Sequence, residues 1–182
     1  MTKQELRLLY KQKRAAIPSD RKSKMDASII EQLIAIILDQ SNIGIFLPIQ
    51  KFNEIDLTPL LKFEKCNWYV PKTNFKETSM CFVKIDKNSV IEENEFGIPE
   101  PISNDIIDPS VLDVIIVPML LADKKGYRVG YGKGFYDRFL PLCRPDCLRI
   151  GVSYFASIDT ISDVQEHDET IQICVNPKLD SF

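Results

Sequence analysis

The amino-acid sequence predicts an α/β fold: a single layered domain over residues 1–182, in which helices flank a mostly parallel or mixed central sheet. Strand-like and helix-like segments alternate along the chain, which is typical of such folds. The clearest strand, residues 113–117, is a β-branched run suited to the buried centre of a parallel sheet. The length of 182 residues is that of one domain with one substantial core, and no repeat, low-complexity tract or linker divides the chain.

The composition is that of a soluble globular protein. Hydrophobic residues make up 45% and charged residues 27%, which argues against disorder and against a membrane-spanning role. No apolar run approaches the roughly 20 residues that cross a bilayer, and the N-terminus lacks a secretory core. We therefore expect a cytoplasmic protein without a membrane partner.

Charge and cysteine content exclude further classes of protein. The net charge of −3 disfavours bulk nucleic-acid binding. The five cysteines are odd in number and form no CxxC pair, which fits neither a disulfide framework nor a tetrahedral zinc site. His167 is the single histidine, so a histidine-rich metal site is excluded.

Two helices are predicted at the N-terminus. The first begins at a capping-box spacing, Thr2 to Glu5. Its apolar positions, which could share one buried face, are Leu6, Leu9, Tyr10 and Ile17. The second helix starts after Pro18 and runs to about Gln40 with a broad apolar face.

The first helix also carries a basic stripe, defined as Lys3, Arg7, Lys11 and Arg14. Spacings of four, four and three residues place all four cations on one helical face. The pattern alone favours a solvated basic face. The functional alternative is an arm that closes over a phosphate-bearing ligand.

Four shorter elements follow. Residues 43–47 indicate a buried strand stopped by Pro48, and Thr58-Pro59 begins a short helix. Further strands are expected at 67–70, ending at Pro71, and at 80–85. Glu54 lies in the loop after the first strand, and such loops bind ligands in α/β sheets.

The second half of the chain continues this alternation. Residues 87–109 are polar and punctuated by proline, and Pro99-Glu100-Pro101 cannot be helical, so we expect this segment to line a surface. Phe96 within it could pack inward or cover a ligand. After the strand at 113–117, a short buried helix is expected at 135–143 and strands at 148–153 and 170–175.

A glycine loop, residues 126–134, lies between the clearest strand and the expected third helix. Four of the seven glycines fall within residues 126–138, and Gly130, Gly132 and Gly134 alternate. The cations around them are Lys124, Lys125, Arg128, Lys133 and Arg138. The spacing matches neither a Walker A loop nor a dinucleotide fingerprint. A glycine triplet alone is also typical of a plain turn, but the basic surroundings indicate a ligand loop.

The glycine loop has the chemistry of a phosphate and metal site. Its backbone amides could cradle phosphate oxygens, while Lys133 and Arg128 could neutralise charge on a transferring phosphoryl group. Asp137, in the first turn of the expected helix, could hold Mg²⁺, although the helix dipole stabilises a carboxylate there without a metal. Mg²⁺ usually takes one or two carboxylates beside phosphate oxygens, so Asp168 is a candidate second ligand.

The most specific segment of the chain is Arg128-Val-Gly-Tyr-Gly-Lys-Gly-Phe-Tyr-Asp-Arg138. Around it, in order, stand Lys3-Gln-Glu-Leu-Arg7, Ile45-Phe-Leu47, Glu54-Ile-Asp56, Phe96-Gly-Ile-Pro99-Glu-Pro101, Val117-Pro118 with Asp123, and His167-Asp168. With these segments in this order, the sequence resembles the 5-formyltetrahydrofolate cyclo-ligase (5,10-methenyltetrahydrofolate synthetase) family over essentially the whole chain.

The resemblance implies a ligase that uses ATP and Mg²⁺ to close 5-formyltetrahydrofolate to 5,10-methenyltetrahydrofolate, with ADP and phosphate released. It implies phosphorylation of the formyl oxygen. We expect Lys133 and Arg128 to be the catalytic residues and the enzyme to be a monomer. The implied ATP contacts are Lys3, Gln4, Glu5, Leu6, Arg7, Arg128, Val129, Gly130, Tyr131, Gly132, Lys133, Gly134, Phe135 and Tyr136. The implied folate contacts are Leu47, Glu54, Phe96, Tyr131, Gly132, Lys133, Gly134 and Phe135, and the implied metal ligands are Asp137 and Asp168.

The chain departs from the family at Met119 and Ala122, where members often carry glycine and an aromatic residue, so we expect altered packing of the pterin pocket. Three alternatives stay open. One is a non-catalytic nucleotide- or folate-binding protein of the same fold. Another is a different α/β enzyme, such as a sugar-phosphate isomerase, which would not need the basic stripe. A nucleic-acid-binding protein is the third, and the acidic balance disfavours it.

Overall fold

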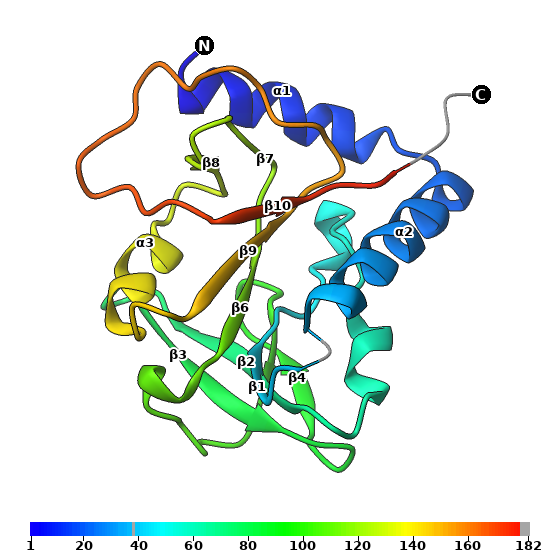
Figure 1. Cartoon of the computed structure of the whole chain (residues 1–182), viewed down its shortest axis with the longest axis vertical. Coiled ribbons are helices and arrows are strands. Elements are labelled where there is room, and N and C mark those ends of the chain that lie inside the picture. Colours follow the sequence, from blue (N-terminus) through cyan, green and yellow to red (C-terminus); the bar gives the residue numbers. More distant parts are fainter. Residues whose placement is uncertain (38, 179–182) are drawn as a thin grey trace.

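The structure is a computed structural model that describes residues 1–37 and 39–178. A six-stranded sheet runs through its centre in the order β10-β9-β6-β1-β2-β3 (Figure 1). These strands are β1 Asn42–Gly44, β2 Asn67–Asn74, β3 Ser79–Ile85, β6 Val114–Pro118, β9 Leu148–Val152 and β10 Ile173–Val175. All neighbouring pairs are parallel except β2 with β3. The predicted α/β class with a mostly parallel sheet is therefore confirmed.

Helices cover both faces of this sheet. Helix α2, Ser19–Ile37, packs its apolar face on the cluster that contains Val114 and Ile116 of β6. Helix α3, Phe135–Phe139, packs on the other cluster, which contains Ile115 and Val117. Because successive side chains of a strand point to opposite faces, β6 contributes to two cores at once. Its continuous apolar run is thereby explained.

Helix α1, Lys3–Ala15, lies over a small hairpin at one end of the sheet (Figure 1). The hairpin pairs β7, Leu121–Ala122, with β8, Arg128–Val129. Leu6 is buried against this hairpin together with Ile161. The predicted capping box is present, since the Glu5 amide donates to Thr2 Oγ1 and the Thr2 amide donates to Glu5 Oε2. Helix α1 is thus fixed both at its start and along its apolar face.

The remaining elements are short. A second hairpin pairs β4, Ile91–Glu93, with β5, Pro99–Pro101, which gives the proline-rich segment its extended conformation. Within residues 1–37 and 39–178, 3₁₀ turns occupy Gln50–Phe52, Thr58–Lys62, Pro109–Val111 and Leu140–Leu142. The two-residue strands β7 and β8 were not predicted, because so short a run shows no period.

Several predicted boundaries were wrong. Strand β2 passes through Pro71 and ends at Asn74. Its neighbour β1 pairs only with residues 67–69, so no ladder partner on that side requires an N–H from Pro71. β1 ends at Gly44 before the predicted residue 47, β10 begins at Ile173 after the predicted 170, and α3 gives way to a 3₁₀ turn at Leu140.

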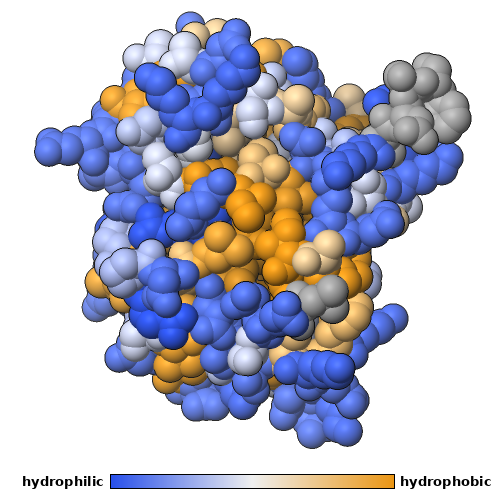
Figure 2. All heavy atoms as spheres, viewed as in Figure 1, coloured by the Kyte–Doolittle hydropathy of each residue, from blue (hydrophilic) through white to orange (hydrophobic). Residues whose placement is uncertain are grey.

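The core beside α2 reaches the molecular surface. Partly buried apolar residues that pack on it include Ile30, Ile34, Leu148 and Ile173. In Figure 2, apolar atoms gather near the centre of the face seen in Figure 1 and are surrounded by hydrophilic ones. Within the residues that the structure describes, no helix combines the length and apolarity needed to cross a bilayer.

Candidate active site

A cavity of about 300 Å³ lies at the carboxyl ends of β1 and β6, which is where the sequence placed the ligand site. Its walls come from α1, the residues after β1, strands β2 and β3, the glycine loop with α3, and residues 165–168. A volume of this size falls at the lower end of the range for small-molecule pockets. One side is lined by cations and carboxylates, and the other is mainly apolar.

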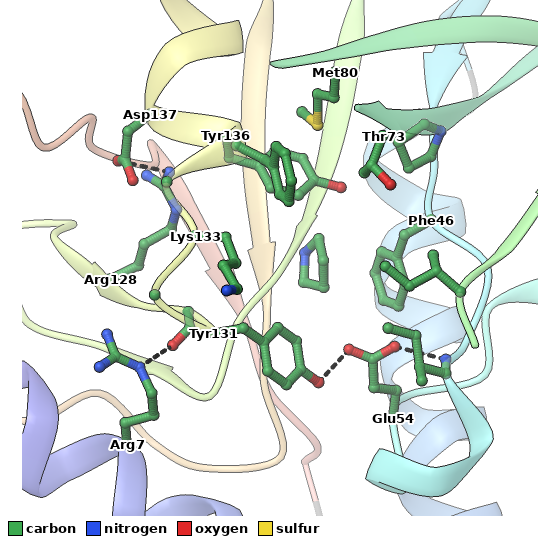
Figure 3. Close-up of a pocket in the computed structure, with 18 of the residues that line it drawn as sticks. Arg7, Phe46, Glu54, Thr73, Met80, Arg128, Tyr131, Lys133, Tyr136 and Asp137 are labelled. Atoms are coloured by element: carbon green, nitrogen blue, oxygen red, sulfur yellow. Dashed lines mark hydrogen bonds and ion pairs between the residues drawn. The ribbon is translucent and has the colours of Figure 1, made fainter. Parts of the chain in front are cut away.

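The basic stripe of α1 faces the glycine loop. The Arg7 Nε donates to the Gly130 carbonyl at 2.8 Å, and the Lys3 ammonium forms an ion pair with Asp168 (Figure 3 shows Arg7). Lys11 lies 5.3 Å from the centre of the Tyr131 ring. The reading that the pattern favoured, a purely solvated face, is therefore wrong. The pKa of Lys11 is lowered, first by burial and then by the positive charges of Arg7 and Arg14, because neighbouring cations repel one another.

Three glycines of the loop, including Gly126 with φ 90°, have conformations that other residues rarely adopt. Gly132 has φ 89° and Gly134 has φ 67°. A Cβ atom at Gly132 would lie 3.0 Å from Cζ of Arg7, so the absence of a side chain lets α1 approach the loop. The expected helix after the loop is short, because α3 has five residues. An anion bound here would be held by the cationic side chains and the loop amides more than by a helix dipole.

The two candidate metal ligands line the same side of the cavity. Asp137 Oδ1 accepts hydrogen bonds from Arg128 Nη2 at 2.8 Å and from the Glu169 amide at 3.1 Å. Asp168, the neighbour of Glu169, is paired with Lys3 and accepts from the Gln165 amide at 2.6 Å. Burial opposes ionisation of Asp168, but these two donors hold its pKa below the ordinary value.

Lys133 lines the cavity and is solvent-exposed, and its side chain lies near the cavity centre (Figure 3). In the described part of the chain, no carboxylate forms an ion pair with Lys133 or with Arg7. Arg128 differs, because its guanidinium is buried and bonded to Asp137 and to the Glu169 carbonyl. The charge of Lys133 is therefore the more available to a ligand.

Glu54 is the buried carboxylate of the cavity, at 3% exposure. Its Oε2 accepts from the Ile49 amide at 2.7 Å, and its Oε1 accepts from the Tyr131 hydroxyl (Figure 3). Burial raises the pKa of Glu54, while the Tyr131 and Ile49 hydrogen bonds and the charges of Arg14 and Lys22 oppose that rise.

Tyr136 places an unsatisfied hydroxyl at the cavity. The residue lines the cavity and packs against the core beside α3, and its buried hydroxyl has no hydrogen-bond partner among the described residues. Burial, followed by the charge of Glu54, raises the pKa of Tyr136, so the hydroxyl keeps its proton. A buried donor of this kind indicates a missing partner, such as a ligand oxygen.

The apolar side holds most of the residues that sequence reasoning missed. Leu47 and Phe135 were predicted, whereas the additional lining residues are Phe46, Ile49, Pro71, Thr73, Met80, Ile98, Pro99, Pro118, Gln165 and His167. Phe46, Ile49 and Pro118 could have been found, because they stand at the ends of predicted strands. Thr73 and Met80 meet through the β2–β3 pairing, which the sequence pattern does not reveal.

Five residues assigned to the site by resemblance do not line the cavity: Gln4, Glu5, Leu6, Val129 and Phe96. Glu5 caps α1, and Leu6 and Val129 are buried where α1 packs on the β7–β8 hairpin. Phe96 stacks on Phe75 with ring centres 3.8 Å apart, and Phe75 meets Phe135 edge-on at 5.1 Å. Phe96 thus reaches the cavity only through these rings.

Three other residues singled out in the sequence also have no wall position. Met119 and Ala122 pack together with Ile171, away from the cavity lining. Because neither residue lines the cavity, these two residues make no direct contact through which they could alter the packing of the pterin pocket. Asp123 is buried and accepts the amides of Lys125, Tyr127 and Ile161, so it orders the β7–β8 turn.

Comparison with known proteins places this cavity in context. Residues 1–177 match the family model described as the 5-formyltetrahydrofolate cyclo-ligase family. A 5-formyltetrahydrofolate cyclo-ligase of Mycoplasma genitalium is 30% identical over 177 residues, which cover 94% of this chain and 97% of the relative.

Two solved structures are also similar. One is a 5,10-methenyltetrahydrofolate synthetase from Mycoplasma pneumoniae, with a TM-score of 0.76 and 25% identity, covering 97% of this chain and 99% of that one. The other is a 5,10-methenyltetrahydrofolate synthetase from Aquifex aeolicus, with a TM-score of 0.82 and 27% identity, covering 98% of this chain and 91% of that one.

Proposed function

The chain belongs to the 5-formyltetrahydrofolate cyclo-ligase family and is a ligase, and we propose that it converts 5-formyltetrahydrofolate to 5,10-methenyltetrahydrofolate with ATP and Mg²⁺, releasing ADP and phosphate. One observation carries the proposal. A single cavity joins a cationic wall suited to polyphosphate to an apolar wall that contains a buried carboxylate. Such a cavity suits two different substrates that must react with each other.

The cationic wall is proposed to bind ATP. Arg7 and Lys133 bring positive charge without carboxylate partners in the described chain, and the loop at Gly130, Gly132 and Gly134 gives backbone amides room to approach phosphate oxygens. Lys3 lies on the same wall in an ion pair with Asp168. Positioning and charge neutralisation are the main protein contributions to phosphoryl transfer.

The apolar wall is proposed to bind the folate. Leu47, Met80 and Phe135 offer surfaces for the flat pterin ring, and Glu54 offers carboxylate oxygens to its N–H groups. The hydroxyl of Tyr136 lacks a partner among the described residues and could donate to a ligand oxygen. This arrangement moves Tyr136 from the ATP side, where the resemblance placed it, towards the folate side.

Asp137 and Asp168 fit a magnesium ion shared with phosphate. Carboxylate oxygens suit Mg²⁺, which usually keeps only one or two protein carboxylates when phosphates complete its coordination. Among the described residues, no cluster of three or more potential ligands forms a closed metal cage. Bound Mg²⁺ would neutralise charge on the phosphate oxygens. Arg128 and Lys3 hold the two carboxylates in place on the cavity wall.

The proposed chemistry has two steps. The formyl oxygen attacks the γ-phosphorus of ATP, the bond to the bridging oxygen breaks, and ADP leaves. The neighbouring folate nitrogen then attacks the activated formyl carbon and loses its proton, and phosphate departs with the former formyl oxygen and can carry that proton away. Lys133 would stabilise charge on the transferring group, while the shared cavity would hold the two substrates in contact.

The proposal is tested by mixing purified protein with 5-formyltetrahydrofolate, ATP and Mg²⁺ and recording the near-ultraviolet absorption of 5,10-methenyltetrahydrofolate. We expect product formation that requires all three components. Binding of both ligands by folded protein without any product would instead support the non-catalytic alternative. We also propose that the enzyme is a cytoplasmic monomer, which sedimentation and cell fractionation would test.

A further inference from the structure

Behind the cavity, a hydrogen-bonded chain joins α1 to the buried carboxylate: Arg14 donates to Tyr131, and Tyr131 donates to Glu54. We infer that Arg14, which does not line the cavity, is a positioning residue that orients the Tyr131 hydroxyl towards Glu54 and so maintains Glu54 as a carboxylate anion for the folate. The inference rests on the proposed function in assigning folate to this wall.

Arg14 has an unusual environment for an arginine. Its side chain is buried, with 4% of the residue exposed, yet no carboxylate in the described chain pairs with it. The guanidinium lies 5.3 Å from the Tyr131 ring centre, and its buried Nε has no hydrogen-bond partner among the described residues. A buried charge without a counter-ion is costly. The anion that offsets it is Glu54, reached through one hydroxyl.

The donors fix the direction of the chain of hydrogen bonds. A guanidinium can only donate, so the Tyr131 oxygen accepts from Arg14 and its proton points to Glu54 Oε1. Glu54 Oε2 faces the Ile49 amide, which is also a donor. A protonated Glu54 would have to donate from one of these oxygens, and both already face donors. The network therefore favours the carboxylate form.

The other charged and titratable groups near Glu54 are one further cation and two tyrosine hydroxyls. Lys22 of α2 adds a second positive charge, and the neutral hydroxyls of Tyr131 and Tyr136 come from the glycine loop and α3. Burial opposes the charge on Glu54. A second hydrogen bond holds the Arg14 backbone close to Glu54. The side-chain amide of Asn53, the residue before Glu54, donates to the Arg14 carbonyl at 2.8 Å.

The arrangement has a consequence for ligand choice. An anionic Glu54 accepts hydrogen bonds and cannot donate, so it favours a ligand edge rich in N–H groups, such as an aminopyrimidine. Arg14 also connects this selection to α1, whose Lys3 and Arg7 line the phosphate side of the same cavity.

A double-mutant cycle tests the inference without any ligand. Arg14→Met, Glu54→Gln and the double variant are denatured thermally between about pH 5 and about pH 9. If Arg14 acts through the charge of Glu54, Arg14→Met should destabilise the wild type more than the Glu54→Gln protein, and the difference should disappear at acidic pH. An equal loss in both backgrounds at every pH would overturn the inference. Arg21→Met, on an exposed arginine of α2, is the matched control and should show no coupling.

Binding of 5-formyltetrahydrofolate in the absence of ATP then links the network to the site. Arg14→Met should weaken binding about tenfold at neutral pH, while in the Glu54→Gln background it should change binding by less than about twofold. Arg14→Lys should recover part of the affinity. If the wild type itself fails to bind this folate, the proposed function fails, and the stability cycle still decides the role of Arg14.

If Arg14→Met does not fold, Tyr131→Phe replaces it. That variant leaves Arg14 and Glu54 in place but removes the hydroxyl between them. It should lower the affinity for the folate and shift the acidic limb of binding to higher pH. An unchanged pH profile of binding would overturn the inference.

Discussion

At the scale of single residues, the cations around the cavity differ in how their charge is already used. Lys3 and Arg128 form ion pairs with Asp168 and Asp137, whereas Lys133 is exposed and has no such partner in the described chain. An unpaired, flexible ammonium can follow charge as it develops on a phosphoryl group. Lys133 is therefore the residue whose loss should affect turnover most selectively.

Replacing Lys133 with alanine should lower kcat by about 10²- to 10³-fold, the usual effect of removing one group that stabilises transition-state charge. The KM for the folate should change little, because Lys133 is proposed to act on the transferring phosphoryl group. Steady-state kinetics under saturating ATP measure both values. Lys125→Ala, an exposed lysine of the β7–β8 turn outside the cavity wall, should behave as the wild type. Equal losses in kcat and folate affinity would indicate a ground-state role for Lys133.

Glu54 should also make stability depend on pH. Burial raises the pKa of Glu54 in the folded protein by more than its hydrogen bonds and the charges of Arg14 and Lys22 lower it, so the folded state binds this proton more tightly than the unfolded chain. Stability from this group is then fully present below the unfolded pKa of about 4.3 and is lost as pH rises through the folded pKa. Thermal melts should show wild type losing stability relative to Glu54→Gln over that window. A constant difference between the two proteins across pH would contradict this.

At the scale of elements, α1 shows what a sequence pattern can and cannot predict. The capping box, the apolar face around Leu6 and the basic stripe were all readable from local spacing. The partner of the stripe was not, because Arg7 and Gly130 are separated by 123 residues. A stripe of cations has the same period whether it faces water or another part of the chain, so only the tertiary structure distinguishes the two.

The contact between α1 and the glycine loop should depend on Gly132 more than on Gly130. Gly132→Ala forces an L residue into φ near 89° and brings a Cβ to 3.0 Å from Arg7. A cost of about 1–2 kcal/mol should lower the melting midpoint by about 2–8 °C. Gly130→Ala is the matched control, since its φ lies outside the left-handed region and nothing lies within 4 Å of the added Cβ. Equal melting midpoints for the two ligand-free variants would count against this account of the contact.

At the scale of the whole molecule, the sheet was predictable and the complete site was not. The strand run at 113–117 and the alternation of elements indicated the parallel α/β class, because each depends on local period. The cavity depends on which strand ends lie side by side. Thr73 and Met80, for example, enter the wall because they are register partners across β2 and β3. No pattern within either strand specifies that register.

The carboxylates of the site illustrate the same limit. Asp137 could be found from the glycine segment, whereas Asp168 had almost no support from pattern. In the structure the two are joined through the adjacent Glu169, whose amide donates to Asp137. Asp168 also pairs with Lys3, so residues 165–168 and the start of α1 meet at the cavity.

Asp137 and Asp168 on the cavity wall should make stabilisation by ATP depend on magnesium. In the wild type, saturating ATP with Mg²⁺ should raise the melting midpoint by about 5–10 °C, as expected for a ligand at roughly a hundred times its Kd. Without Mg²⁺ the rise should be much smaller. Asp168→Asn should lose most of the magnesium-dependent part, because one carboxylate remains to share the ion with phosphate. Asp159→Asn removes an exposed carboxylate away from the cavity and is the matched control. If Asp168→Asn keeps the full magnesium-dependent rise, Asp168 is a partner of Lys3 alone and the metal site must be sought around Asp137.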